Sequence, residues 1–201
     1  ISGIYITTQQ FSNICLPFTQ SDKIDNLITS GSDNFSNTKK GKTTVTSALN
    51  RLKEELIQIK NQNNSNDDVL TYIRAKGYSE KFVRITELSN QSDGPVFIFS
   101  NWLQYGVQSL AIILEACGYV KYPLEGEKRY FVWSSETKTM ENGQININKA
   151  RNDFNSPENI NGSVLKIILG TRSVMEGVSF KNVKQVHMTD PWWNEARIEQ
   201  I

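Results

Sequence analysis

Short apolar segments alternate with longer amphipathic ones between Gly94 and Ile201, and this alternation restricts the fold more than any other feature of the sequence. PVFIFS (95–100) is a continuous apolar run, typical of a strand buried on both faces. Three further strands are predicted at RYFVW (129–133), VLKIIL (164–169) and VKQVHM (183–188). The stretch after PVFIFS has apolar residues at helical spacing and ends at Gly118. Strands separated by helices of this length predict an α/β fold, an open parallel sheet with helices on both faces.

The N-terminal part of the chain follows a different pattern. Residues 1–18 are predicted to be extended and to join the α/β lobe at a sheet edge, and residues 19–93 to form a polar loop and a helical insertion. Within the insertion, apolar residues at helical spacing predict a long helix, a shorter one ending near Gly77, and a third over Ser79–Leu88. The α/β lobe itself is expected to cover residues 94–201.

Several kinds of site have little support in the sequence. KKGKTT (39–44) matches only the end of a phosphate-loop motif, because Ser36 stands where a glycine is required, so we expect a solvated basic turn before a helix. The single histidine, His187, lies in an apolar segment, where a structural role is the commoner one. The two cysteines, Cys15 and Cys117, lack the spacing of a zinc site. Zinc-dependent and histidine-based hydrolases are therefore disfavoured.

A polar turn after the third apolar segment is the most informative feature for function. Gly170 is followed by Thr171 and Arg172, and in open α/β sheets ligands bind at the carboxyl ends of strands. Hydroxyls, backbone N–H groups and an arginine suit a phosphate backbone. Glu176 and Gly177 follow a few residues later. A tight connection with surface polar residues explains the same pattern, so the residues alone leave both interpretations open.

The last stretch of the chain resembles motif V of superfamily 2 helicases and translocases, running into motif VI. DPWWN (190–194) is similar to the corresponding segment of Swi/Snf-type translocases. The longer stretch EGVSFKNVKQVHMTDPWWNEARIEQI is still more similar to helicases of large DNA viruses, including the poxvirus-type nucleoside triphosphate phosphohydrolase and early transcription factor. Those proteins continue into a Gln-x-x-Gly-Arg-x-x-Arg box. Gln200 matches its first glutamine, so the resemblance implies that the chain stops within motif VI.

The resemblance extends to earlier segments in the same order. The stretch GPVFIFSNWLQYGVQSLAIILEACGY is similar to motif IV and its helix, and QQFSNICLPF is similar to the segment that follows the first motor lobe in the viral group. Two departures stand out: Ser134-Ser135 replaces a glycine-containing turn, and Gln9 replaces an arginine. The resemblance covers Tyr5–Pro17 and about Tyr78–Ile201.

By resemblance, the chain is expected to be the second of two RecA-like lobes in an ATP-dependent helicase or translocase. The residues implied to contact nucleic acid are Ser100, Asn101, Thr171 and Arg172. The residues implied to face the nucleotide are Glu176, Gly177 and Gln200. ATP and Mg would be bound mainly by a first lobe with a phosphate loop and an Asp-Glu box. The catalytic arginines of motif VI would lie beyond Ile201, so we expect the chain by itself to hydrolyse no ATP.

Three tryptophans are candidates for stacking on bases: Trp102, Trp192 and Trp193. Packing in a core or interface is the alternative, and it is the commoner role of such rings. The implied partners are DNA or RNA, the first lobe of the same polypeptide, and transcription or replication proteins that dock on the helical insertion. No membrane contact is expected, and an intracellular location is predicted, in the host cytoplasm or the virion if the protein is viral.

A rival hypothesis keeps the fold and removes the catalysis. It describes a non-catalytic nucleic-acid-binding or protein-docking module with a RecA-like fold. Sequence upstream of Ile1 would separate the two hypotheses, because a motor needs a phosphate loop there.

Overall fold

The computed structural model describes residues 12–17, 39–63, 65–140, 142–172 and 178–190. The helices are α3 (Lys39–Asn63), α4 (Asn66–Ala75), α5 (Glu80–Gln91), a π-helix (Leu103–Gln108), α6 (Ser109–Ala116), α7 (Ser135–Thr139), α8 (Gly143–Phe154) and a 3-10 turn (Pro157–Asn159). The strands are β1 (Val96–Phe99), β2 (Val120–Lys121), β3 (Arg129–Trp133), β4 (Ile167–Gly170) and β5 (Gln185–Met188). None of the helices in these ranges is long and apolar enough to span a membrane.

The five strands form one parallel sheet in the order β2-β3-β4-β1-β5. Phe99 at the end of β1 lies opposite Gly170 of β4 on one side and Met188 of β5 on the other. Trp133 at the end of β3 also lies opposite Gly170. The predicted open parallel sheet is confirmed, and the carboxyl ends of β3, β4, β1 and β5 meet at one edge.

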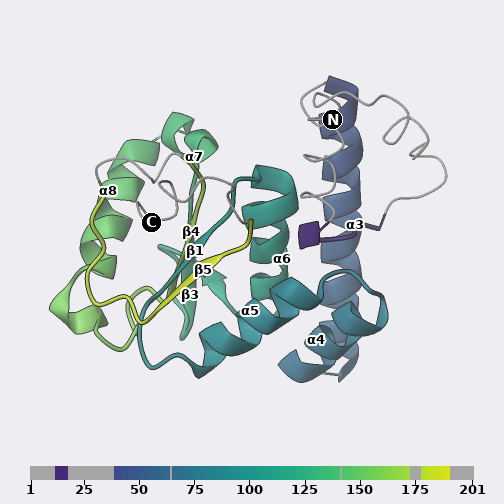
Figure 1. Cartoon of the computed structure of the whole chain (residues 1–201), viewed down its shortest axis with the longest axis horizontal. Helices are drawn as coiled ribbons and strands as arrows, with labels where there is room; N and C mark the ends of the chain where they lie inside the picture. Colours follow the sequence, from purple (N-terminus) through teal and green to yellow (C-terminus); the bar gives the residue numbers. More distant parts are fainter. Residues whose placement is uncertain (1–11, 18–38, 64, 141, 173–177, 191–201) are drawn as a thin grey trace.

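Helices cover both faces of the sheet, as predicted (Figure 1). Along β1, Val96 and Ile98 belong to one hydrophobic cluster, while Phe97 and Phe99 belong to the other. This alternation follows from the two-residue period of a strand. The second cluster includes the buried side chains of α8, and the first includes those of α3, α4, α5 and α6.

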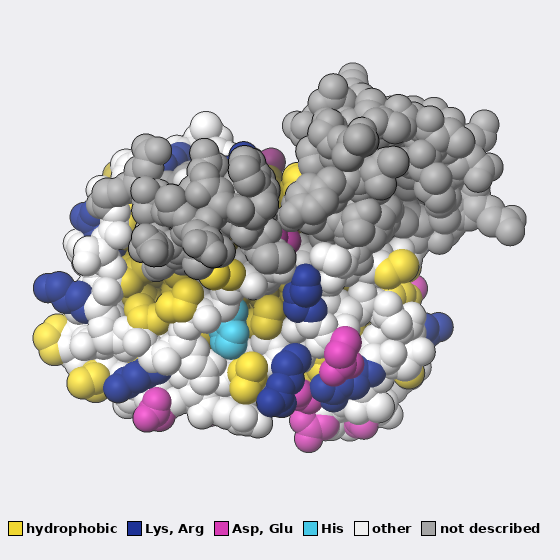
Figure 2. Space-filling model, in the orientation of Figure 1, with side chains coloured by type: hydrophobic (Ala, Val, Ile, Leu, Met, Phe, Trp, Pro, Cys, Tyr) yellow, Lys and Arg dark blue, Asp and Glu magenta, His cyan; other side chains and the backbone are white. Residues whose placement is uncertain are grey.

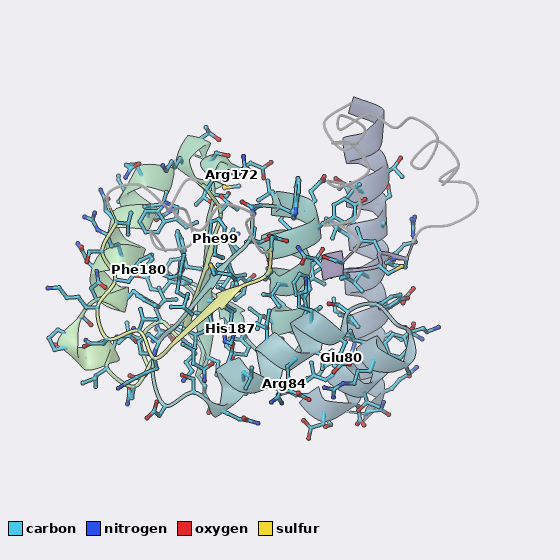
Figure 3. The ribbon with its side chains drawn as sticks, viewed as in Figure 1. Glu80, Arg84, Phe99, Arg172, Phe180 and His187 are labelled. Carbon is cyan, nitrogen blue, oxygen red and sulfur yellow. The ribbon has the colours of Figure 1, made fainter. Side chains whose placement is uncertain are left out.

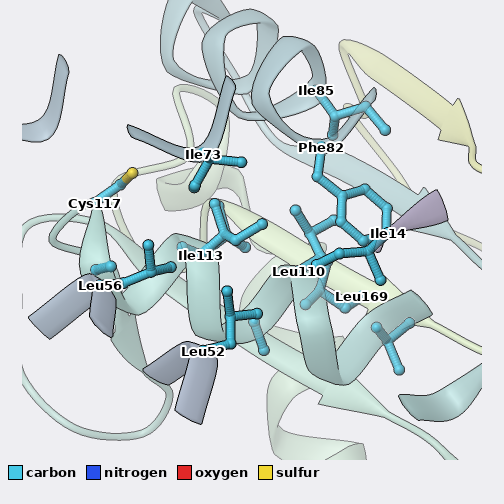
Figure 4. Close-up of a cluster of buried hydrophobic side chains, with 14 of the residues drawn as sticks. Ile14, Leu52, Leu56, Ile73, Phe82, Ile85, Leu110, Ile113, Cys117 and Leu169 are labelled. Carbon is cyan, nitrogen blue, oxygen red and sulfur yellow. The ribbon is translucent and has the colours of Figure 1, made fainter. Parts of the chain in front are cut away.

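The helices α3, α4 and α5 share their core with the sheet. Leu52 of α3, Ile73 of α4 and Phe82 of α5 are fully buried in the cluster that contains Ile113 of α6 and Ile98 of β1 (Figure 4). Their amphipathic spacing predicted one apolar face for each helix, but spacing does not reveal which surface that face packs against. In the structure these helices pack in the same layer as α6.

One local prediction was wrong, and another falls largely outside the described residues. The stretch 39–44, expected as a turn, lies within α3, which begins at Lys39. Lysine is a good helix former, and one glycine inside a helix costs only about 1 kcal/mol. The described part of the N-terminal segment, residues 12–17, contains no strand, and the N–H of Cys15 donates to the carbonyl of Tyr78 rather than to a sheet edge. Ile14 is buried in the cluster of α3–α6, because an apolar side chain gains more there than at an exposed edge.

His187 lies on β5, with its Nε2 3.0 Å from Oε1 of Gln185, and burial lowers the pKa of the imidazole below its ordinary value. The unfolded chain therefore binds a proton first as the pH falls below about 6.5, so stability that is present above that pH is lost on acidification. We expect the melting temperature to fall between about pH 7 and pH 5.5, and to fall less in His187→Gln. Circular dichroism melts across that range measure the difference. Equal slopes for both proteins would show that His187 contributes nothing to the pH dependence.

Candidate functional site

The predicted site residues at the ends of β1 and β4 lie next to each other. Because β1 and β4 are paired in parallel, Asn101 and Arg172 both emerge at the carboxyl edge of the sheet. Nε of Arg172 donates to Oδ1 of Asn101 over 3.3 Å. Figure 3 places Arg172 at the end of the molecule opposite Arg84 and Glu80. Arg172 is exposed and Asn101 is partly exposed, so a ligand approaching this edge can reach both side chains.

A buried carboxylate that the sequence did not single out joins these turns. Asp190 follows β5, is 1% exposed, and accepts four hydrogen bonds. Its Oδ2 accepts from the hydroxyl of Ser100 over 2.7 Å, from the backbone N–H of Asn101 over 2.7 Å, and from the hydroxyl of Thr189 over 3.0 Å. Its Oδ1 accepts from the side-chain amide of Asn13. Four donors compensate the cost of burying this charge.

Asn13 connects the carboxylate to helix α5. Its Oδ1 accepts from Nζ of Lys81 over 2.8 Å, and its backbone carbonyl accepts from the hydroxyl of Ser79. Lys81 also donates to the carbonyl of Thr189 over 2.9 Å. Burial lowers the pKa of Lys81, and the Asp190 carboxylate acts in the opposite direction. The two ends of the described chain, 177 positions apart, are thereby joined at the sheet edge.

Ser100 faces inward rather than toward solvent. Ser100 is 1% exposed, and its side-chain oxygen accepts from the backbone N–H of Trp102 over 3.2 Å in addition to donating to Asp190. A β-carbon on Gly106, in the π-helix, would lie 2.1 Å from the Ser100 oxygen, so only glycine leaves room for the hydroxyl. Thr171 is 9% exposed, and its N–H donates to the carbonyl of Trp133 over 3.1 Å. Contacts of Ser100 and Thr171 with phosphate stay predictions.

The remaining predicted residues divide into packed and undescribed ones. Trp102 packs against the cluster of α3–α6, and its indole N–H is buried with no hydrogen-bond partner among the described residues. Ser134, at the turn where relatives were expected to carry glycine, caps α7 by accepting from the N–H of Thr137 over 3.2 Å. The following predicted residues lie outside the described ranges: Glu176, Gly177, Trp192, Trp193 and Gln200.

The described residues contain no group of three or more His, Cys, Asp or Glu side chains arranged to hold a metal ion. Asp190 does not suit magnesium, because both of its oxygens already accept hydrogen bonds from protein donors. The site's chemistry is instead that of a surface arginine and amide held by a buried carboxylate. Such groups donate to phosphate oxygens.

Comparisons with known proteins identify viral helicases as relatives of the chain. The chain is 34% identical over 150 residues to a putative ATP-dependent RNA helicase of Acanthamoeba polyphaga mimivirus, covering 73% of this chain and 25% of the relative. It is 34% identical over 111 residues to a putative helicase of Invertebrate iridescent virus 3, covering 52% of this chain and 11% of the relative. It is 31% identical over 156 residues to a termination factor NPH-I homologue of African swine fever virus, covering 61% of this chain and 22% of the relative.

The chain matches no family model. It spans a quarter or less of the length of each of these three relatives. The matches nevertheless cover about half to three quarters of the chain, and they come from several different viruses. The chain is therefore homologous to a part of these viral helicases.

Proposed function

We propose that the chain is the second motor lobe of an ATP-dependent helicase or translocase, and that it holds the nucleic-acid backbone at the carboxyl edge of its sheet. The observation that supports this most directly is the pair formed by Arg172 and Asn101, which the fold presents together at that edge. A guanidinium and a side-chain amide bind phosphate oxygens irrespective of base sequence. Such contacts suit a protein that moves along a strand.

The charges on α4 and α5 favour the carboxyl edge of the sheet over these helices as the place where nucleic acid binds. Basic and acidic side chains mix over the region of α4 and α5 (Figure 2). Arg74 pairs there with Glu80 and Glu87 at 2.9 Å each, and Arg84 lies 3.5 Å from Glu87. Paired charges of this kind attract a polyanion weakly. Docking of transcription or replication proteins on these helices remains a proposal without a contact that supports it.

ATP would be bound between this lobe and a first lobe of the same polypeptide. Glu176, Gly177 and Gln200 would face the nucleotide, and the arginines that stabilise the transferring phosphoryl group would come from beyond Ile201. An arginine finger contributes about 10³–10⁵ in rate. We therefore expect the purified chain to show no ATPase activity, with or without oligonucleotide, in a phosphate-release assay. Nucleic-acid-stimulated release of phosphate by this chain would contradict the proposal.

Replacement of Arg172 by alanine tests the nucleic-acid contact. We expect Arg172→Ala to weaken binding of a fluorescein-labelled single strand about fivefold to tenfold, and to reduce the slope of log Kd against log salt concentration by about 0.7. Fluorescence anisotropy titrations at several salt concentrations measure both quantities. Because one phosphate contact is lost, the weakening should be similar for strands of different sequence.

Arg84→Ala is the matched control, since it removes the same charge from the opposite end of the molecule (Figure 3). Its dissociation constant should stay within about twofold of the parent value, because Arg84 is exposed on α5 and its described partner is Glu87. Equal weakening of binding by both substitutions would mean that affinity depends only on the overall charge of the protein, and the proposed contact would be wrong.

A further inference from the structure

We propose that Asp190 is a positioning residue for nucleic-acid binding, which acts by holding Asn101, and through it Arg172, in the orientation that meets the strand; this inference rests on the proposed function. Asp190 is 1% exposed, so it does not meet a ligand itself. Its Oδ2 accepts from the backbone N–H of Asn101 over 2.7 Å. Asp190 therefore acts on binding through Asn101, which is proposed to meet the strand.

The turn after β1 is fixed at three successive residues. The hydroxyl of Ser100 and the backbone N–H of Asn101 each donate a hydrogen bond to Oδ2 of Asp190. The backbone N–H of Trp102 donates to the side-chain oxygen of Ser100. The side-chain oxygen of Asn101 then accepts from Arg172. The direction of the Asn101 amide, and the position of the Arg172 guanidinium beside it, consequently depend on the carboxylate.

The carboxylate is itself held from a distant part of the chain. A lysine ammonium only donates, so the bond from Lys81 requires the oxygen of the Asn13 amide to face the lysine. The NH2 group of Asn13 then faces Oδ1 of Asp190. This leaves Oδ2 directed at the turn after β1. Asn13 and Lys81 thus complete the site, although neither was predicted.

Two substitutions, each of which removes one hydroxyl donor to Oδ2 of Asp190, separate an effect on the position of Asn101 from an effect on stability. Ser100→Ala removes a hydrogen bond from the turn that carries Asn101, whereas Thr189→Val removes one from the residue next to Asp190, after the end of β5. Thr189 and Ser100 are both buried, so the two variants should lower the melting temperature by similar amounts. We expect Ser100→Ala to weaken single-strand binding about fivefold and Thr189→Val less than about twofold.

A double-mutant cycle adds a measurement that a merely structural role would not change. Asn101→Ala should weaken binding about threefold to fivefold in the parent chain but by less than about twofold in Ser100→Ala, because Asn101 is already displaced there. All titrations use the same labelled strand and anisotropy measurement, and circular dichroism confirms that each variant is folded.

The outcomes distinguish the two proposals. If Asn101→Ala and Arg172→Ala weaken binding but Ser100→Ala and Thr189→Val have equal effects, or if the cycle is additive, the positioning role of Asp190 is wrong and the proposed function stands. If the parent chain does not bind the strand, or Asn101→Ala and Arg172→Ala bind it as tightly as the parent, the proposed function fails and the positioning role fails with it. A selective loss in Ser100→Ala together with a non-additive cycle supports both.

Discussion

Phe82→Ala is expected to lower the free energy of unfolding by about 3–5 kcal/mol. The Phe82 ring is fully buried, in the cluster that contains Ile14 and Leu110 (Figure 4). Truncation would remove the ring from between α5 and its neighbours, and the cavity left would be lined by side chains fixed on several separate elements. A cavity lined in this way collapses poorly, so the loss of stability should lie in the upper part of the range for large-to-small substitutions.

Urea denaturation followed by far-ultraviolet circular dichroism measures this loss, and Phe154→Ala is the matched control. Phe154 is equally buried but lies on the opposite face of the sheet, in the cluster of α8. Since the sheet joins the two clusters, both variants should unfold in one cooperative transition with a lower midpoint. A separate early transition in Phe82→Ala, with the sheet still folded, would instead indicate that α3–α5 form an independent unit.

The sequence predicted the sheet well because buried parallel strands leave a strong local signal. The apolar segments at 95–100 and 129–133 contain β1 and β3 almost residue for residue. The segments at 164–169 and 183–188 begin earlier than β4 and β5, which start at Ile167 and Gln185. The residues directly before these strands still bond to neighbouring segments, since the N–H of Lys166 donates to the carbonyl of Arg129 and the N–H of Lys184 to that of Pro95. The two-residue strand β2 was missed, since two residues cannot establish a period.

The sequence predicted the exposed residues of the site but not the buried carboxylate that joins them. Arg172 was expected at the carboxyl edge because it follows a strand, whereas Asn101 was expected only from the resemblance to motif IV; parallel pairing of β1 and β4 brings the two together. The role of Asp190 was missed, because its partners Asn13 and Ser100 lie 177 and 90 positions away and no local pattern links them. The one local signal was an aspartate two residues after a predicted strand, where a carboxylate at the sheet edge would be expected to have partners.

Gly106→Ala is expected to lower the free energy of unfolding by about 3–5 kcal/mol, from overpacking together with a lost charge-assisted hydrogen bond. The new β-carbon would lie 2.1 Å from the oxygen and 2.6 Å from the β-carbon of Ser100. Rotating the hydroxyl away relieves only the first contact, so the π-helix or the end of β1 must also move. The Ser100 hydroxyl would then no longer reach Asp190, and binding of a single strand should weaken along with stability.

Ser100→Gly tests this explanation, because it removes the two atoms that would lie within 3.0 Å of the new β-carbon. The double variant Gly106→Ala, Ser100→Gly should be more stable than Gly106→Ala and no less stable than Ser100→Gly alone, as urea denaturation would show. Its single-strand binding should stay weak, because Asp190 still lacks its hydroxyl partner. If the double variant is instead the least stable of the three, the cost arises from elsewhere in the π-helix. Recovery of stability without recovery of binding would separate the packing role of Gly106 from the positioning role of the hydroxyl that it accommodates.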